Sequence, residues 1–235
     1  MAAARIRKQA ILDARSSKVV AVEVLCPRPM ALPLGDTEAM CANDIAMAEY
    51  ALLLAEAIKL PVHFNVEPET LMLAGDKILQ YAKHGGPLIV LEVVERLSLL
   101  SHPGAIEWLD HAIAEIRSVG ALIAMDDVTP TDRERELIRR FRPDIIKVED
   151  PGAIPVVREI SGATGSARIV VERIETRESA ELCRLYGADM LQGFWCDNAG
   201  YPQIVDLHPA FSDTPPRLGG LAIGVRGQRD AKTAA

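Results

Sequence analysis

Short apolar runs of strand length alternate with helical segments about seven times along this chain of 235 residues. Such alternation is typical of a parallel sheet whose strands are connected by helices. Because single α/β barrels commonly reach this length, we expect so many units to close into a barrel rather than an open sheet. The sequence therefore predicts the α/β class, with a TIM-barrel-like (β/α) architecture.

The two ends of the chain depart from this alternation. Residues 9–13 and 19–25 are apolar runs separated only by residues 14–18, which indicates a hairpin and hence one antiparallel strand at the start of the barrel. Residues 213–235 show little periodicity and accumulate Pro, Gly, Asp and Arg. We expect one barrel domain over residues 1–212, followed by a flexible tail over residues 213–235.

The other elements follow from apolar periodicity and from the Pro and Gly residues between the segments. Strands are predicted at residues 62–66, 88–94, 121–127, 144–148, 169–172 and 189–193. Helices are predicted at residues 43–59, 67–84, 106–119, 131–141, 152–160 and 177–186.

Composition and charge narrow the function. The formal net charge of -7 argues against a nucleic-acid backbone as the main partner. No stretch approaches the roughly 20 apolar residues of a membrane helix, and the basic N-terminus has no apolar run behind it, so we expect a cytoplasmic protein. The four cysteines lack zinc-like spacing and are expected to be reduced, mostly buried thiols.

The polar residues at the ends of the strands are the candidate site. In a barrel, the carboxyl ends of the strands meet at one mouth, where active sites lie. All but one of these residues bear oxygen, which suits Mg²⁺, Mn²⁺ or Ca²⁺ better than Zn²⁺. His63 is interpreted as out of phase with Asn65 and is left out of the set. The set consists of Glu23, Asn65, Glu92, Asp126, Asp127, Lys147, Glu172 and Gln192.

Asp126 and Asp127 are the most informative pair, since two adjacent carboxylates end a buried apolar run. Burying unpaired charge is costly, so a cation or proton must hold them. Adjacent aspartates fit a two-metal site that hydrolyses phosphodiesters. Each residue also has a purely structural interpretation. The aspartates could cap a helix, Asn65 could form an Asx-turn, and Glu172 and Glu175 could lie in the first turn of a helix. Glu92 and Glu95 could lie on a solvated loop, and Lys147 could lie on the surface. The joint occurrence at successive strand ends favours the site.

The order of these motifs resembles that of the EAL domain, the bacterial cyclic di-GMP phosphodiesterase domain. The resemblance covers about residues 9–196, and the set is specific although no single motif is. Glu23-Val24-Leu25 is similar to the motif that names the family. The other matching segments are residues 64–71, 91–95, 124–127, 146–149, 171–176 and 189–194.

The resemblance implies a role for each residue. It implies Glu23, Asn65, Glu92, Asp126 and Asp127 as ligands of two Mg²⁺ or Mn²⁺ ions, with Ca²⁺ as an inhibitory substitute. It implies Lys147 as the group that steadies the water or phosphate, and Glu172 as general base. It further implies Leu25, Arg28, Glu175 and Gln192 as substrate-binding or supporting residues. The implied reaction opens cyclic di-GMP to linear pGpG.

Several residues depart from the family pattern. Residues 128–134 contain no glycine where the family has a Gly- and Ser-rich loop, so we expect a different backbone there and a lost partner for Glu95. Arg28 stands one residue later than the family's phosphate-binding arginine. Arg173 replaces a glycine beside Glu172, where we expect its cation to favour the ionised carboxylate.

These departures leave three functions open. The first is a metal-dependent cyclic di-GMP phosphodiesterase. The second is a degenerate EAL-like domain that serves as a cyclic di-GMP receptor or protein-binding regulator with little or no catalysis. The third is a different metal-dependent hydrolase. The expected partners are cyclic di-GMP and either a second copy of the chain or a regulatory protein, without DNA, RNA or membrane.

Overall fold

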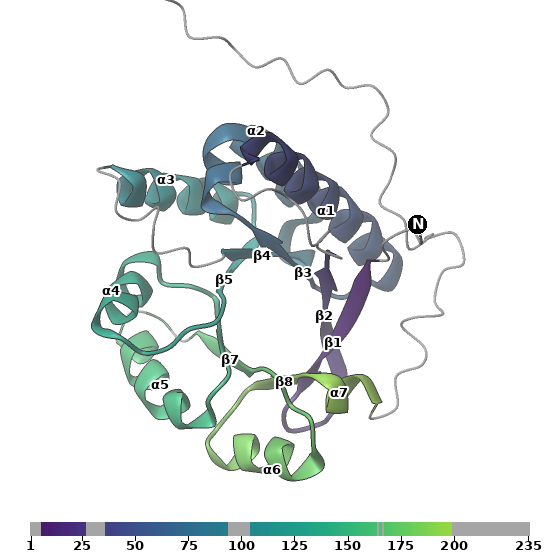
Figure 1. Cartoon of the computed structure of the whole chain (residues 1–235), viewed down its shortest axis with the longest axis vertical. Coiled ribbons are helices and arrows are strands. Elements are labelled where there is room, and N and C mark those ends of the chain that lie inside the picture. Colours follow the sequence, from purple (N-terminus) through teal and green to yellow (C-terminus); the bar gives the residue numbers. More distant parts are fainter. Residues whose placement is uncertain (1–5, 27–35, 94–103, 164, 166, 199–235) are drawn as a thin grey trace, which may run out of the picture.

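The computed structural model describes residues 6–26, 36–93, 104–163, 165 and 167–198. Eight strands form a closed barrel in the order of the chain (Figure 1). The expected α/β barrel is therefore confirmed. The strands are β1 (Arg7–Asp13), β2 (Val19–Leu25), β3 (Val62–Val66), β4 (Ile89–Val93), β5 (Leu122–Met125), β6 (Ile145–Val148), β7 (Arg168–Val171) and β8 (Met190–Gln192).

The antiparallel start of the barrel is also confirmed. β1 runs antiparallel to both β2 and β8, and it closes the barrel between them. All the other neighbouring strands are parallel. The helices lie on the outside (Figure 1). They are α1 (Thr37–Ile58), α2 (Pro68–Gly85), α3 (Ala105–Ser118), α4 (Asp132–Phe141), α5 (Ile154–Gly162), α6 (Arg177–Leu185) and α7 (Phe194–Asn198).

Most predicted elements agree with the structure to within two residues, but α1 begins six residues earlier than expected. Its N-cap is Asp36, whose carboxylate accepts a hydrogen bond from Ala39 N at 3.0 Å. An acidic side chain at this position satisfies a free backbone N–H group of the first turn. The sequence Asp36-Thr37-Glu38, a capping residue followed by an acid in the first turn, therefore indicated the start of α1, whereas the apolar stripe begins later. The short helix α7 was not predicted, and residues 213–235 lie outside the described residues.

Two apolar layers hold the barrel together. The larger layer packs the outward side chains of the strands against the helices. A smaller cluster contains only strand residues and fills the barrel interior: Ile11, Ala21, Val90, Ala124, Ile145, Val170 and Met190. Side chains of a strand alternate between faces, so residues two positions further along also point inward. For most strands, that next inward residue is one of the polar residues predicted for the site.

Within the described residues, no helix combines the length and apolarity needed to cross a membrane. All four cysteines are free thiols, and Cys41, Cys183 and Cys196 are buried. Burial raises the pKa of the Cys196 thiol to about 12, so this thiol stays protonated at neutral pH.

Gly193, directly after β8, allows the backbone to pass close to the segment that follows β7. Its φ angle is 146°, and an added Cβ atom would overlap the backbone nitrogen and oxygen of Ile174. The two segments are joined here because Ile174 N donates to Gln192 O at 3.0 Å, and Trp195 N donates to Ile174 O at 2.9 Å. This close approach places the end of β8 against the segment that follows β7.

We expect Gly193→Ala to lower the free energy of unfolding by about 2–4 kcal/mol, from backbone strain and overpacking. Gly75→Ala is the control, because its Cβ would have no described heavy atom within 4 Å. The control should raise stability by about 0.5–1 kcal/mol, as alanine suits a helix better than glycine does. Urea unfolding followed by circular dichroism measures both variants, and equal stabilities would contradict the account.

Candidate active site at the barrel mouth

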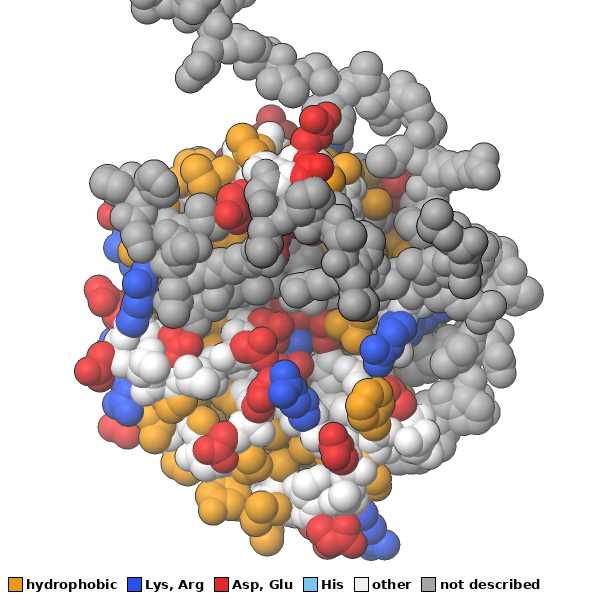
Figure 2. Space-filling model, viewed as in Figure 1, with side chains coloured by type: hydrophobic (Ala, Val, Ile, Leu, Met, Phe, Trp, Pro, Cys, Tyr) orange, Lys and Arg blue, Asp and Glu red, His pale blue; other side chains and the backbone are white. Residues whose placement is uncertain are grey.

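Acidic side chains gather at the centre of one face of the molecule, over the end of the barrel to which the parallel strands point (Figure 2). Glu23, Asn65, Glu92, Lys147 and Gln192 lie near the ends of β2, β3, β4, β6 and β8. Asp126 and Glu172 directly follow β5 and β7, and Asp127 comes next to Asp126. We call Glu23, Glu92, Asp126, Asp127, Lys147 and Glu172 the mouth cluster.

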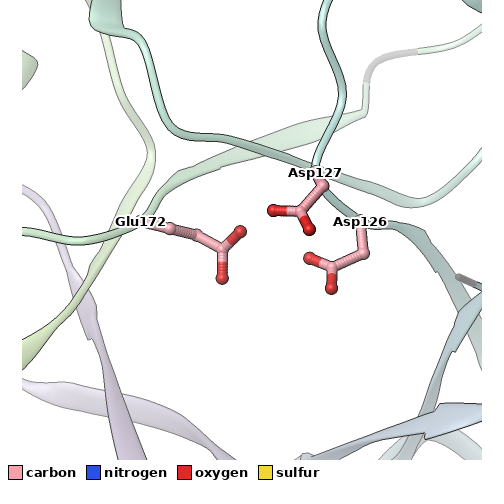
Figure 3. Close-up of side chains that lie close together, drawn as sticks. All are labelled: Asp126, Asp127 and Glu172. Carbon is pink, nitrogen blue, oxygen red and sulfur yellow. The ribbon is translucent and has the colours of Figure 1, made fainter. Parts of the chain in front are cut away.

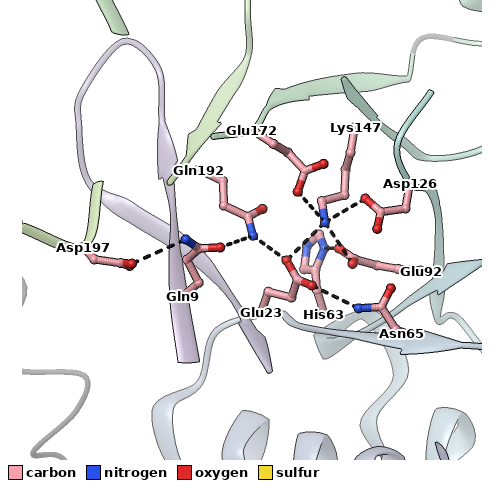
Figure 4. A network of polar contacts seen from close by, with 10 residues as sticks. All are labelled: Gln9, Glu23, His63, Asn65, Glu92, Asp126, Lys147, Glu172, Gln192 and Asp197. Carbon is pink, nitrogen blue, oxygen red and sulfur yellow. Dashed lines mark hydrogen bonds and ion pairs between the residues drawn. The ribbon is translucent and has the colours of Figure 1, made fainter. Parts of the chain in front are cut away.

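Lys147 lies at the centre of the mouth cluster (Figure 4). Its side chain is only 1% exposed. Its Nζ atom donates hydrogen bonds to Glu23 Oε2 at 3.1 Å and to Glu92 Oε2 at 2.9 Å. The same atom forms ion pairs with Asp126 Oδ1 at 3.0 Å and Glu172 Oε1 at 2.9 Å. One ammonium group thus faces four carboxylates, which leaves an excess of negative charge.

Asp126, Asp127 and Glu172 converge on one point (Figure 3). Each offers one carboxylate oxygen, and these oxygens lie within 4.8 Å of one another. Asp127 has a left-handed backbone with φ of 50°, a conformation that Asp tolerates better than most residues. Although Asp126 Oδ1 is buried and close to Lys147, it accepts no hydrogen bond of good geometry from a described residue.

Burial and mutual repulsion shift the carboxyl groups of the mouth cluster. Burial, followed by the charge of Glu92, raises the pKa of Glu23 to about 7. Burial likewise raises the pKa of Glu92 to about 7 and that of Glu172 to about 9, against the opposing effect of Lys147. Burial alone would lower the pKa of Lys147, but Glu92, Glu23 and the other acids raise it well above its ordinary value. Lys147 is therefore charged, and the carboxyl groups compete for a further cation or proton.

These donors fit a hard divalent cation. All the available ligand atoms are oxygens, the negative charge exceeds the positive charge, and a buried oxygen of Asp126 lacks a hydrogen bond. Mg²⁺, Mn²⁺ and Ca²⁺ prefer such oxygen donors. Neighbouring amides hold Glu23 in place, since Asn65 Nδ2 donates to Glu23 Oε1 at 3.1 Å, and Gln192 Nε2 donates to Glu23 Oε2.

The interpretation that His63 is out of phase with Asn65 is wrong. Residues two apart on a strand share a face, so both side chains point into the barrel. His63 Nδ1 lies 2.8 Å from Glu92 Oε1, and both side chains are buried. Burial, helped by the positive charge of Lys147, lowers the pKa of His63 to about 3, so the imidazole is neutral.

A chain of hydrogen bonds that the sequence analysis missed connects the mouth to α7. Gln192 Nε2 donates to Gln9 Oε1 at 3.0 Å, and Asp197 accepts from Ala10 N at 3.0 Å and more weakly from Gln9 Nε2 at 3.5 Å (Figure 4). The inward phase of Gln9, two residues before Ile11, was the signal in the sequence. Nothing in the sequence pattern pointed to Asp197.

The remaining predicted site residues are less central. Leu25 ends β2 and is half-buried, while Glu175 is exposed and makes no hydrogen bond or ion pair with the mouth cluster as described. Arg28 and Glu95 lie outside the described residues. The cation beside Glu172 is Lys147 rather than Arg173, because the Arg173 guanidinium pairs with Glu149 at 2.7 Å. The expectation that a cation favours the ionised form of Glu172 is wrong for the metal-free protein, since burial raises the pKa of this carboxyl to about 9 despite Lys147.

The segment after Asp127 owes its order to Glu134. This buried carboxylate accepts hydrogen bonds from Thr129 Oγ1 at 3.0 Å, Thr131 Oγ1 at 2.9 Å and Thr131 N at 3.1 Å. Thr131 in turn caps α4, so the two residues form a capping box. Side-chain hydrogen bonds therefore take the place of glycine turns in shaping this segment.

The model of the EAL domain family matches residues 37–199, which is more than half of the chain. The chain belongs to the EAL domain family. The match begins after Glu23-Val24-Leu25, so this motif is assigned by its position at the end of β2. No curated protein sequence matches the chain.

Solved structures of EAL proteins share the fold. The Bacillus subtilis YkuI protein, solved with its substrate c-di-GMP and calcium, has a TM-score of 0.68 and 24% identity over 81% of this chain and 53% of its own. Klebsiella pneumoniae BlrP1, solved with manganese and cyclic di-GMP, has a TM-score of 0.65 and 22% identity over 81% and 54%. The PaMucR phosphodiesterase, in a c-di-GMP complex, has a TM-score of 0.65 and 19% identity over 81% and 93%. The chain thus spans about half the length of the first two proteins.

Metal-free protein should lose stability as the pH rises from about 7 to about 9. Glu172 has a folded-state pKa of about 9, well above its unfolded value, so the folded state holds a proton that the unfolded state has released. His63 does not oppose this trend, since it is neutral in both states above its usual pKa.

The expected loss is about 2 kcal/mol, equivalent to one proton over this range. It is measured by urea unfolding in a chelating buffer, with the same series in saturating Mn²⁺ as the control. Because bound Mn²⁺ would compensate the carboxylates of the mouth cluster, the free energy of unfolding should depend less on pH in that series. A chelated protein whose stability is constant or rises over this range would contradict the proposed charge balance.

Proposed function

We propose that this chain binds two divalent cations at the barrel mouth and hydrolyses cyclic di-GMP to linear pGpG. The observation that carries the proposal is the gathering of four carboxylates around Lys147, with Asp127 beside them, at the end of the barrel where the strands converge. A stable fold has no use for this excess of buried charge unless cations compensate it.

The proposed metal ligands are those that the family resemblance implies: Glu23, Asn65, Glu92, Asp126 and Asp127. Mg²⁺ or Mn²⁺ is the proposed cofactor, and Ca²⁺ is proposed as an inhibitory substitute. When bound, such cations stabilise the charge on the phosphate oxygens and lower the pKa of a water molecule. Metal-containing structures of YkuI and BlrP1 support this choice, since they hold calcium and manganese respectively.

Glu172 and Lys147 are the proposed catalytic residues. In the reaction, the oxygen of a water molecule bonds to phosphorus, the P–O3′ bond breaks, and the ribose oxygen takes up a proton. Glu172 is suited to accept the proton of the water because its carboxylate reaches the mouth, and bound cations would lower its pKa from about 9 so that it is ionised at neutral pH. Lys147 holds Glu172 at 2.9 Å and offers a fixed positive charge to the phosphate.

The substrate-binding roles are also proposals. Gln192 lies beside Glu23 and Gln9, and Leu25 ends β2 on the same rim. Arg28 and Glu175 are proposed from the resemblance alone. A cytoplasmic location and either a homodimer or a regulatory protein partner remain predictions.

Asp126→Asn tests the proposed metal chemistry. We expect wild-type protein to convert cyclic di-GMP to pGpG in Mn²⁺, and the variant to lose at least about a hundredfold in kcat/KM, because the carboxylate charge is removed. We also expect the variant to lose most of the rise in Tm that Mn²⁺ produces in the wild type.

Asp132→Asn is the matched control, since Asp132 is an exposed residue in the first turn of α4. This variant should keep both the activity and the Mn²⁺ response. Liquid chromatography of the nucleotides and differential scanning fluorimetry provide the two measurements. Absence of turnover, together with an unchanged Mn²⁺ response in Asp126→Asn, would rule out the hydrolase.

A second candidate is a nucleotide receptor or protein-binding regulator with little or no catalysis. The observation that favours it is the glycine-free segment after Asp127, which Glu134 and the capping box hold in one conformation. A segment fixed in this way is suited to a static binding surface.

Calorimetry with cyclic di-GMP in Ca²⁺ separates the receptor from the protein-binding regulator. A receptor should bind the nucleotide while Mn²⁺ yields no pGpG, and Glu23→Gln should weaken the binding at least about tenfold by removing a charged ligand. Asp132→Asn again serves as the control. If the nucleotide does not bind, a protein partner becomes the function to pursue.

A further inference from the structure

His63 is a buried histidine directly below the mouth cluster, on the same strand as Asn65. β3 pairs with β4 so that His63 lies opposite Val90, and Asn65 lies opposite Glu92. The imidazole therefore belongs to the inward layer next to the mouth. From there His63 Nδ1 reaches up to Glu92 Oε1 at 2.8 Å (Figure 4).

The two oxygens of Glu92 have different partners. Oε1 faces the His63 imidazole, while Oε2 accepts from Lys147 at 2.9 Å. With a cation at the mouth, Glu92 would be ionised and could only accept, so the imidazole would then donate its Nδ1–H to Oε1. Glu92 is completely buried, and this bond fixes both the rotation of its carboxylate and the oxygen that faces the other acids.

We propose that His63 is a positioning residue for Glu92, holding Oε1 so that Oε2 is presented to a divalent cation at the barrel mouth. The inference rests on the metal site of the proposed function. Hydrogen bonds from a second layer of residues orient metal ligands, and their loss typically costs about 10–100-fold in metal affinity. His63 itself does not touch the substrate or the cation.

Three variants separate this role from packing. His63→Leu fills much of the same volume but has no donor. His63→Asn carries an amide N–H group near the position of Nδ1. Val90→Ala, in the adjacent position on β4, removes only apolar packing from the same interior layer.

The readout is the Mn²⁺ dissociation constant of the full chain, measured by calorimetry without nucleotide. We expect His63→Leu to weaken Mn²⁺ binding about 10–100-fold. His63→Asn should bind within about threefold of the wild type because it restores a donor. Val90→Ala should lower Tm and leave the dissociation constant unchanged. Equal Mn²⁺ affinity of wild type and His63→Leu would overturn the inference, as would a loss in His63→Asn as large as that in His63→Leu.

A measurement on the wild type covers the case in which His63→Leu does not fold. Long-range ¹⁵N–¹H spectra of the histidine rings, with His63 assigned by its absence in His63→Asn, report which ring nitrogen carries the proton. We expect the Nδ1–H form, with a change in its shift on adding Mg²⁺. The Nε2–H form in the presence of Mg²⁺, or ring-nitrogen shifts that Mg²⁺ leaves unchanged, would overturn the inference.

The same data distinguish this inference from the proposed function. A wild-type protein that binds no Mn²⁺ contradicts the metal site and, with it, the role of His63. A wild type that binds Mn²⁺ while His63→Leu binds equally well contradicts the role of His63 alone.

Discussion

The arrangement of the barrel mouth depends on the compensation of clustered carboxylates by Lys147. Its ammonium group lies between acids from β2, β4 and the segments after β5 and β7, and all four distances are about 3 Å. One charge cannot balance four, so the raised pKa values of Glu23, Glu92 and Glu172 describe a site that remains short of positive charge. Divalent cations would supply the missing charge, which connects the electrostatics of this fold with the chemistry proposed for it.

The barrel produces this cluster by simple alternation. Inward positions below the mouth are apolar, as Val90, Ala124 and Ile145 illustrate, and the inward positions two residues later are Glu92, Asp126 and Lys147. The apolar layer excludes water from beneath the site, and burial then strengthens each electrostatic contact above it. His63 breaks the alternation, because it places a polar group in the deeper layer, where it meets Glu92.

Much of this could be predicted from the sequence. The strand ends, the barrel and its antiparallel start follow from local periodicity, and the oxygen donors stand out because charged residues rarely end buried strands. The start of α1 was missed because its cap at Asp36 precedes the apolar stripe. His63 was left out of the predicted site because it was assigned to the opposite face of its strand from Asn65, although residues two apart on a strand share a face. The chain of contacts through Gln9 to Asp197 joins residues nearly the whole domain apart, and no local pattern encodes such a contact. The roles of the site residues are predictions that rest on the family resemblance.

Anomalous diffraction from crystals soaked in Mn²⁺ would show whether cations occupy the barrel mouth. We expect two anomalous peaks among Glu92, Asp126 and Asp127, roughly 3.5–4 Å apart as in other two-metal sites. We also expect Oε2 of Glu92, rather than Oε1, on the metal side. A mouth without anomalous density, with Lys147 still surrounded by its four carboxylates, would contradict the metal-dependent function and leave only the fold.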